Sequence, residues 1–182
     1  MDRQPILDGD RLTLRPLRAD DWTALFAVAS DPKIWALHPA HDRWREPVFR
    51  AFFDDALESG GALVMTDKTT GTIIGSSRYG VPGAEGPGEI EIGWTFLARS
   101  YWGSGWNAQA KRLMLAHALA FVDRVIFQIG IDNVVSRRAM ANIGGRLIEG
   151  RSRLHERGGA MVEHVFYEIT PESFATGPLS RR

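Results

Sequence analysis

The sequence predicts an α/β domain (α+β in some schemes) with a mixed, mostly antiparallel sheet of about seven strands and about four helices. Stretches that alternate apolar and polar residues, typical of half-buried strands, recur between stretches with helical spacing. Their order is strand, two helices, three antiparallel strands, helix, strand, helix and two strands, and no repeat or linker divides the chain. We therefore expect one domain over residues 1–182, with a core at about 11–169 and a fraying tail at 171–182.

The first third of the chain predicts one strand and two helices. Residues 11–17, Arg-Leu-Thr-Leu-Arg-Pro-Leu, alternate with the period of a strand. Asp20 precedes apolar residues at helical spacing, which predicts an acidic cap and a helix that ends at Asp31-Pro32. Residues 34–44 are irregular and rich in aromatic residues, and Pro47 predicts the first turn of a second helix.

The rest of the chain supplies the other strands and helices. Residues 62–66 and 72–79 predict a hairpin, and the loop 80–88 contains four glycines and two prolines. After a strand at 89–96, the later elements are a helix over 106–121, a strand over 125–131 buried on both faces, a short helix over 135–143, and strands over 146–150 and 161–169.

The strand over residues 89–96 leads into a glycine-rich turn. Its alternation places Glu89 and Glu91 on one face. The other face is expected to carry Ile90, Ile92 and Trp94. Residues 98–110, Ala-Arg-Ser-Tyr-Trp-Gly-Ser-Gly-Trp-Asn-Ala-Gln-Ala, then bring small residues and free backbone N–H groups to the start of a helix. Such a turn can hold a phosphate through its amides and the positive end of the helix dipole, although many similar turns bind nothing.

Composition and charge narrow the class of protein. The 182 residues are 44% hydrophobic and 24% charged, as in ordinary globular domains. Lysine plus arginine and aspartate plus glutamate both number 22, so there is no basic excess to indicate a nucleic-acid partner. The absence of cysteine excludes a cysteine nucleophile, a thiolate metal site and disulfides. With no apolar signal region or membrane-length apolar stretch, we expect a cytoplasmic protein with no membrane partner.

Several motifs, taken in order, resemble the GNAT superfamily of acyl-CoA-dependent N-acyltransferases. They are the strand and the Tyr-Trp-Gly-Ser-Gly-Trp turn at 101–106, Asn-Val-Val-Ser at 133–136, and a helix ending in Ile-Gly-Gly at 143–145. The opening strand followed by Asp20-Asp21 is similar to the branch of ribosomal-protein N-terminal acetyltransferases, the Rim type. The resemblance covers roughly 11–169 and implies the GNAT fold, splayed at its central parallel pair of strands.

The resemblance implies acetyl-CoA as cosubstrate and no metal. The turn amides would hold the CoA pyrophosphate, the end of the preceding strand would pair with the pantetheine arm, and Asn133 would bond that arm from the other side. The implied cofactor-binding residues are Thr95, Phe96, Leu97, Arg99, Gly103, Ser104, Gly105, Trp106, Asn107 and Asn133.

The chain departs from the family pattern at three places. Ser100 stands where glutamine or arginine is usual, three residues before the first glycine, and Arg99 lies one place earlier. Residues 108–110 are Ala-Gln-Ala where Thr-Glu-Ala is common in the Rim-type branch. Met140 occupies the position at which many members carry a tyrosine general acid. Tyrosine is therefore unavailable for that role at that position.

The implied reaction is direct transfer of an acetyl group to a primary amine, which requires the amine to lose a proton. Glu91 is the candidate base, because the family often places a glutamate on this strand; the alternative is a solvated strand residue. Ser136 is the candidate for protonating or hydrogen-bonding the leaving sulfur, and the alternative is a helix cap.

The acceptor is expected to be a protein N-terminus or a small-molecule amine. In the family, the region after the first helix borders the acceptor pocket, which implies the candidates Trp35, His38, Trp44, Arg78 and Tyr79, although tryptophans here can equally pack in the core. His38, His41 and Asp42 offer no fourth metal ligand. His117 on an apolar helix face is expected to be a core histidine.

Two other functions remain as alternatives. A non-catalytic module that binds CoA as a sensor would explain the missing tyrosine and the altered turn. A phosphotransferase is disfavoured because no Walker-type lysine follows the glycines. Dimers are frequent in the resembling branch, so the resemblance also implies a homodimer.

Overall fold

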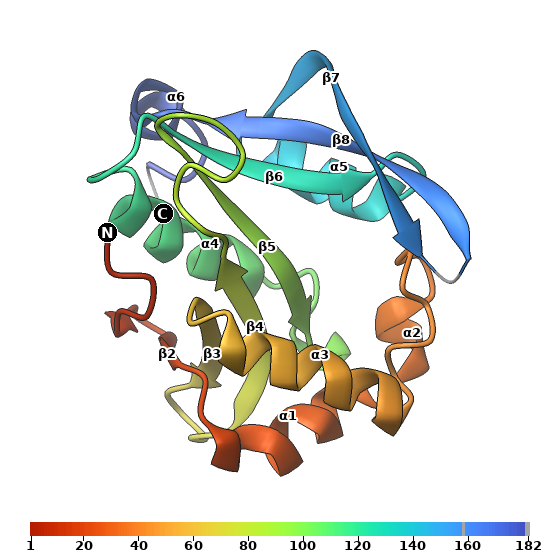
Figure 1. Cartoon of the computed structure of the whole chain (residues 1–182). Coiled ribbons are helices and arrows are strands. Elements are labelled where there is room, and N and C mark those ends of the chain that lie inside the picture. Colours follow the sequence, from red (N-terminus) through yellow and green to blue (C-terminus); the bar gives the residue numbers. More distant parts are fainter. Residues whose placement is uncertain (158, 181–182) are drawn as a thin grey trace.

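A computed structural model describes residues 1–157 and 159–180, which form one eight-stranded sheet with helices on both faces (Figure 1). The strands are β1 (Leu7–Asp8), β2 (Leu12–Pro16), β3 (Ala62–Asp67), β4 (Ile73–Tyr79), β5 (Glu89–Leu97), β6 (Arg124–Gly130), β7 (Arg146–Arg157) and β8 (Ala160–Ile169). The α-helices are α1 (Trp22–Ala29), α2 (Pro32–Trp35), α3 (Glu46–Glu58), α4 (Trp106–Ala118), α5 (Val134–Asn142) and α6 (Pro171–Thr176). The sheet order is β1-β2-β3-β4-β5-β6-β8-β7, and every neighbouring pair is antiparallel except β5–β6.

Two hydrophobic clusters cover the two faces of this sheet. On one face, α4 and α5 pack against β2 to β6 and β8 through residues such as Met114, Ile90 and Met140. On the other face, α1 and α3 pack against β3 to β5, with Phe49 and Phe53 fully buried. The predicted mixed α/β fold is confirmed, and the sheet has one strand more than expected because the two-residue β1 was not foreseen.

The strands β5 and β6 pair over only three residues. Beyond these residues the two strands diverge, as Figure 1 shows. Their register ends at Glu91 opposite Ile126. Beyond that point β5 pairs only with β4, and β6 pairs only with β8. Among the described residues, the backbone groups of residues 92–97 that point away from β4 therefore have no partner strand. We call the opening between residues 92–97 of β5 and residues 127–130 of β6 the fork.

A bulge in the open part of β5 changes which side chains of this strand point to each face of the sheet. Trp94 has φ +52°, the positive φ of a non-glycine residue, and the β4–β5 register shifts nearby. Ile92 and Phe96 would share a face in a regular strand, yet Ile92 packs in the α4 cluster and Phe96 in the α1–α3 cluster. The prediction that Trp94 shares a face with Ile92 is wrong: the guanidinium of Arg78, which pairs with Asp55 on α3, lies 4.8 Å from the Trp94 ring.

Three further expectations are corrected at the ends of elements. The aromatic-rich stretch after Asp31 is not wholly irregular, because Asp31 caps the four-residue α2 by accepting from the Lys33 amide. The helix expected to reach residue 121 ends at Ala118. Residues 171–180 of the expected tail do not fray: Thr170 and Ser173 form a reciprocal capping box for α6, and Leu179 beyond it is 2% exposed. The last two residues of that tail, 181 and 182, lie outside the described residues.

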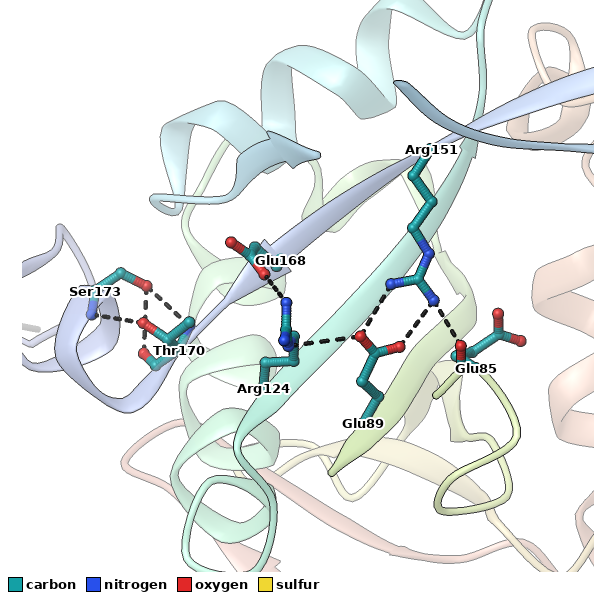
Figure 2. Close-up of polar contacts among 7 residues, drawn as sticks. All are labelled: Glu85, Glu89, Arg124, Arg151, Glu168, Thr170 and Ser173. Atoms are coloured by element: carbon teal, nitrogen blue, oxygen red, sulfur yellow. Dashed lines mark hydrogen bonds and ion pairs between the residues drawn. The ribbon is translucent and has the colours of Figure 1, made fainter. Parts of the chain in front are cut away.

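An ion-pair cluster closes the paired end of the fork (Figure 2). Glu89 on β5 is almost fully buried and accepts two hydrogen bonds from Arg151 on β7, at 2.9 and 2.8 Å. Arg124 on β6 lies 3.5 Å from the same carboxylate and 3.1 Å from Glu168 on β8. Arg151 also donates to the carbonyl of Glu85 in the β4–β5 loop. The cluster thus connects all four strands that meet at the paired end.

We predict that Arg151→Met lowers the free energy of unfolding by about 2–4 kcal/mol at neutral pH, because it leaves the buried Glu89 carboxylate without its main partner. Arg151 lowers the pKa of Glu89, so its contribution is present above the ordinary carboxyl pKa of 4.5 and is lost as the pH falls below that value. Urea denaturation at pH values from 7 down to about 3 measures the difference in unfolding free energy between the wild type and the variant. This difference should become smaller as the pH falls below 4.5.

Lys68→Met is the matched control, because it removes a cation from the exposed pair with Asp8. We expect it to cost less than about 1 kcal/mol. Equal deficits for the two variants, or a deficit for Arg151→Met that does not change with pH, would contradict this role for the cluster.

Candidate active site

The glycine turn links the open end of β5 to the N-terminus of α4. Gly103 and Gly105 adopt φ of +71° and +84°, which side chains with a Cβ rarely tolerate, and Gly105 is the N-cap of the helix. The first amides of a 13-residue helix have no intrahelical acceptor and lie at its positive end. The structure therefore forms the kind of turn expected to bind an anion.

Arg11, which the sequence analysis placed only in a strand pattern, braces this turn. Its guanidinium donates to the Ser104 carbonyl at 3.1 Å and lies 4.6 Å from the centre of the Trp106 ring. Tyr101 packs edge-on against Trp106, and its hydroxyl donates to Asp67 at 3.0 Å. The turn is thus fixed against β2 and β3 and does not depend on a ligand for these contacts.

Glu91 lies at the fork, on the face opposite α4. Its Oε2 accepts from Gln128 Nε2 on β6 at 3.0 Å, and Gln128 Oε1 lies 3.0 Å from His155 Nε2 on β7. Burial, reinforced by the negative charge of Glu85, raises the pKa of Glu91 to about 7. A carboxyl group with this pKa can accept a proton near neutral pH, as a general base must.

Lys111 lies on the α4 face of the same strand and is buried. Its Nζ donates to Thr95 Oγ1 at 2.6 Å and to Ser77 Oγ at 3.1 Å. Nζ is also 5.9 Å from the centre of the Phe127 ring on β6. Burial lowers the pKa of Lys111 to about 7.

The other predicted cofactor residues have mixed environments. Phe96 and Leu97 are buried, and the Leu97 carbonyl accepts from Trp102 Nε1 at 2.8 Å. Arg99 forms an ion pair with Asp31, the N-cap residue of α2. Asn107 Oδ1 is buried without a hydrogen-bond partner among the described residues.

Asn133 and Ser136 lie together at the start of α5. Asn133 is the N-cap and accepts from the Ser136 amide at 3.1 Å, so the cap is Asn133 and not Ser136. Ser136 is partly exposed, and its hydroxyl makes no hydrogen bond within the described part of the chain. Its hydroxyl is therefore available to a ligand.

Two of the five predicted acceptor residues, Trp35 and Tyr79, pack in the core. Trp35 is 2% exposed and donates to the Ala29 carbonyl, and Tyr79 is fully buried with its hydroxyl donating to the Met114 carbonyl on α4. Burial raises the pKa of Tyr79 well above its usual range. We assign both residues to the core and leave them out of the acceptor pocket.

Of the remaining three acceptor candidates, His38 and Trp44 are at least partly exposed, whereas Arg78 is a buried polar residue. His38 packs edge-on against the Trp35 ring, and its Nδ1 accepts from the Ala40 amide. Trp44 is 37% exposed. Arg78 donates to Asp55 at 2.6 Å, while its Nε and Nη2 have no hydrogen-bond partner among the described residues.

Sequence reasoning missed Lys111 and Gln128, although both left a signal. Lys111 precedes Met114, Leu115 and Ala118 by three, four and seven residues, so it lies on the buried face of α4. Gln128 is the one amide in the otherwise apolar 125–131 strand pattern. A polar residue at a buried position usually has a specific partner.

The turn and the open strand edge fit the parts of CoA. The helix amides suit its pyrophosphate, the open edge of β5 suits the amides of its pantetheine arm, and Asn107 Oδ1 is an unpartnered acceptor beside the turn. Within residues 1–157 and 159–180, no three His, Cys, Asp or Glu residues form a group that could hold a metal ion. No helix in the same residues is long and apolar enough to cross a bilayer.

Comparisons with solved structures show the same fold in bacterial acetyltransferases. A GCN5-related N-acetyltransferase from Brucella melitensis superposes with a TM-score of 0.83 at 21% identity, covering 98% of this chain and 83% of that one. Mycobacterium smegmatis RimJ in complex with CoA-disulfide has a TM-score of 0.74 at 20% identity, with 97% and 92% covered. A Vibrio cholerae protein assigned as a ribosomal-protein-serine acetyltransferase has a TM-score of 0.70 at 14% identity, with 94% and 100% covered.

The family of this chain is assigned from its sequence, by a match to a family model. A comparison with curated protein sequences returned no match. The family model described as an acetyltransferase (GNAT) domain matches residues 11–146, which include the fork, the glycine turn and α5. At 20% and 14% identity, the RimJ and Vibrio cholerae structures show that the fold is shared. The chain therefore belongs to the GNAT family of acetyltransferases.

Proposed function

We propose that this protein is a cytoplasmic, acetyl-CoA-dependent N-acetyltransferase that transfers the acetyl group directly to a primary amine. The observation that carries the proposal is the fork between β5 and β6, with a helix N-terminus at its open end and Glu91 at its closed end. An open strand edge, an anion site and a base of suitable pKa are the parts that such a transfer requires.

The fork and the glycine turn would hold CoA. The amides of residues 103–107 would bind its pyrophosphate, and the unpaired backbone groups of 92–97 would pair with the pantetheine arm. Asn133 would contribute its side-chain NH₂, because its carbonyl oxygen already caps α5. Bound acetyl-CoA supplies a thioester, an acyl group activated for attack by an amine.

Glu91 would accept the proton that the acceptor nitrogen loses. At a pKa of about 7 it is substantially ionised at neutral pH, and the hydrogen bond from Gln128 fixes one of its two oxygens. Glu91 would take this proton directly or through one water. The absence of cysteine agrees with direct attack and no acyl-cysteine.

The acceptor would approach from the face that carries Glu91. Arg78, Trp94 and α3 lie on this face. His38, Trp44 and Arg78 are the candidates that border the pocket. The acceptor class is a primary amine, either a peptide N-terminus or a small molecule.

We predict that Gly103→Ala weakens acetyl-CoA binding at least about tenfold, because a side chain at φ +71° strains the turn and projects beside the phosphate-binding amides. Gly71→Ala is a close control: it has the same φ of +71° and likewise no atom within 4 Å of the added carbon, but it lies in the β3–β4 turn. Isothermal titration of both variants measures the difference. Equal affinities of the two variants for acetyl-CoA would contradict the assignment of the glycine turn to the CoA site.

We predict that Glu91→Gln lowers kcat by about 10²- to 10⁴-fold. Its Kd for acetyl-CoA should stay within about threefold of the wild-type value, since the change affects a proton transfer and not cofactor binding. In the wild type, kcat/KM should rise as the pH increases through about 7, because Glu91 must be deprotonated to act. Stopped assays of CoA thiol release over a panel of amines and peptides measure kcat and kcat/KM, and isothermal titration measures the Kd for acetyl-CoA.

Glu172→Gln, at an exposed position in α6, is the control and should behave as wild type. A Glu91→Gln enzyme with wild-type kcat would exclude Glu91 from the chemistry. Tight acetyl-CoA binding by the wild type, with no thiol release on any acceptor, would instead support the non-catalytic sensor.

A further inference from the structure

The side chain of Lys111 ends at the fork. Its Nζ bonds Thr95 on the unpaired part of β5 and lies 5.9 Å from the centre of the Phe127 ring on β6. Phe127 directly follows Ile126, the last β6 residue that pairs with β5. The amine therefore lies on the α4 face of the sheet, bonded to β4 and β5, with the Phe127 ring of β6 nearby.

The hydrogen-bond partners that the described residues give this amine are two hydroxyl groups. Ser77 Oγ and Thr95 Oγ1 lie 2.8 Å apart, and both are within hydrogen-bond reach of the Gly93 carbonyl at the bulge. Within residues 1–157 and 159–180, Lys111 forms no ion pair. A lysine buried only among hydroxyls is costly to maintain, because its charged form loses hydration without gaining a counter-ion.

Lys111 and Glu91 occupy opposite faces of the sheet at the same fork. Phe127 belongs to the α4-side cluster, whereas the neighbouring Gln128 bonds Glu91 on the other face. The charged neighbour of Ser77 on β4, Arg78, also points to the Glu91 face, where it pairs with Asp55. A ligand in the fork would thus have a carboxyl group on one side and an amine on the other.

We infer that Lys111 is a catalytic residue that binds the sulfur end of CoA in the fork and protonates it as it leaves. This inference rests on the proposed function, since it assumes that the pantetheine arm enters the fork. Thr95 and Ser77 are positioning residues, because they hold the amine at the bulge. The assignment gives a function to an otherwise unexplained buried amine.

The step balances as follows in bonds and protons. The acceptor nitrogen forms a bond to the acetyl carbon, and the carbon–sulfur bond breaks with its electron pair remaining on sulfur. Lys111, as an ammonium, gives a proton to that sulfur, and Glu91 receives a proton from the acceptor nitrogen. Afterwards Lys111 is neutral and Glu91 is protonated, so a proton returned through solvent restores both groups.

The test is the ionisation of the CoA thiol when CoA is bound to the whole protein. A nearby ammonium stabilises a thiolate and lowers the thiol pKa. Thiolate absorbance of the CoA complex, titrated from about pH 6 to 10 with desulfo-CoA as the thiol-free blank, reports this pKa without any acceptor. We expect bound CoA to ionise at least about one pH unit below free CoA, a tenfold shift in equilibrium.

Lys111→Met removes the amine and keeps an unbranched side chain of similar length. Its bound CoA should ionise at or above the pH of free CoA, while its affinity for desulfo-CoA stays within about threefold of wild type. Lys33→Met, which removes an exposed lysine on α2, should titrate like wild type.

Two results would overturn the inference: no lowering of the thiol pKa in the wild-type complex, or the same lowering in Lys111→Met. The wild-type titration decides the question even if the Lys111 variant does not fold. Failure of the wild type to bind either CoA or desulfo-CoA in isothermal titration would overturn the proposed function and this inference with it. Normal binding with an unshifted thiol would overturn the role of Lys111 alone.

Discussion

The short pairing of β5 with β6 is the constraint on which the rest of the structure depends. Three register pairs join the strands, and the buried Glu89 carboxylate with Arg151 and Arg124 holds that end closed. Beyond Glu91, β5 pairs with β4 on both sides of the bulge and β6 pairs with β8, so a neighbouring strand braces each side of the fork. A backbone edge left open inside a rigid sheet is a site for an extended ligand, because the strands need not be reorganised to accept it.

The fork also explains why two titratable groups have shifted pKa values. Burial disfavours charge on either kind of group, so it raises the pKa of Glu91 and lowers that of Lys111 to about the same value. The bulge at Trp94 keeps the partners of the two groups apart: Thr95 faces Lys111, while Arg78 and Trp94 lie on the Glu91 face. Met140, buried on α5, has no proton to donate, so the proton donor must be another residue.

Much of this arrangement could be predicted from local patterns in the sequence. Strand alternation, helix spacing and the two glycines before Trp106 predicted the strand–turn–helix that the structure contains, because each depends on nearby residues alone. The bulge could not be predicted, since alternation assumes a regular strand, and the wrong face for Trp94 followed from that assumption. Tyr79 was placed among the acceptor candidates because of the family resemblance, and such a resemblance does not show that its hydroxyl bonds the Met114 carbonyl on α4. Lys111 and the Thr170 cap did leave signals, and a stricter count of helical faces and caps would have found them.

The most direct test of the central claim is backbone hydrogen exchange of the whole protein with and without saturating acetyl-CoA. If the fork holds the pantetheine arm and the turn holds the pyrophosphate, amides in residues 92–97 and 103–108 should exchange more slowly in the complex. The amides of β7, on the far edge of the sheet, should not change. Protection of the turn without any protection of 92–97, or no protection of either segment, would contradict the account that the open edge of β5 is the cofactor site.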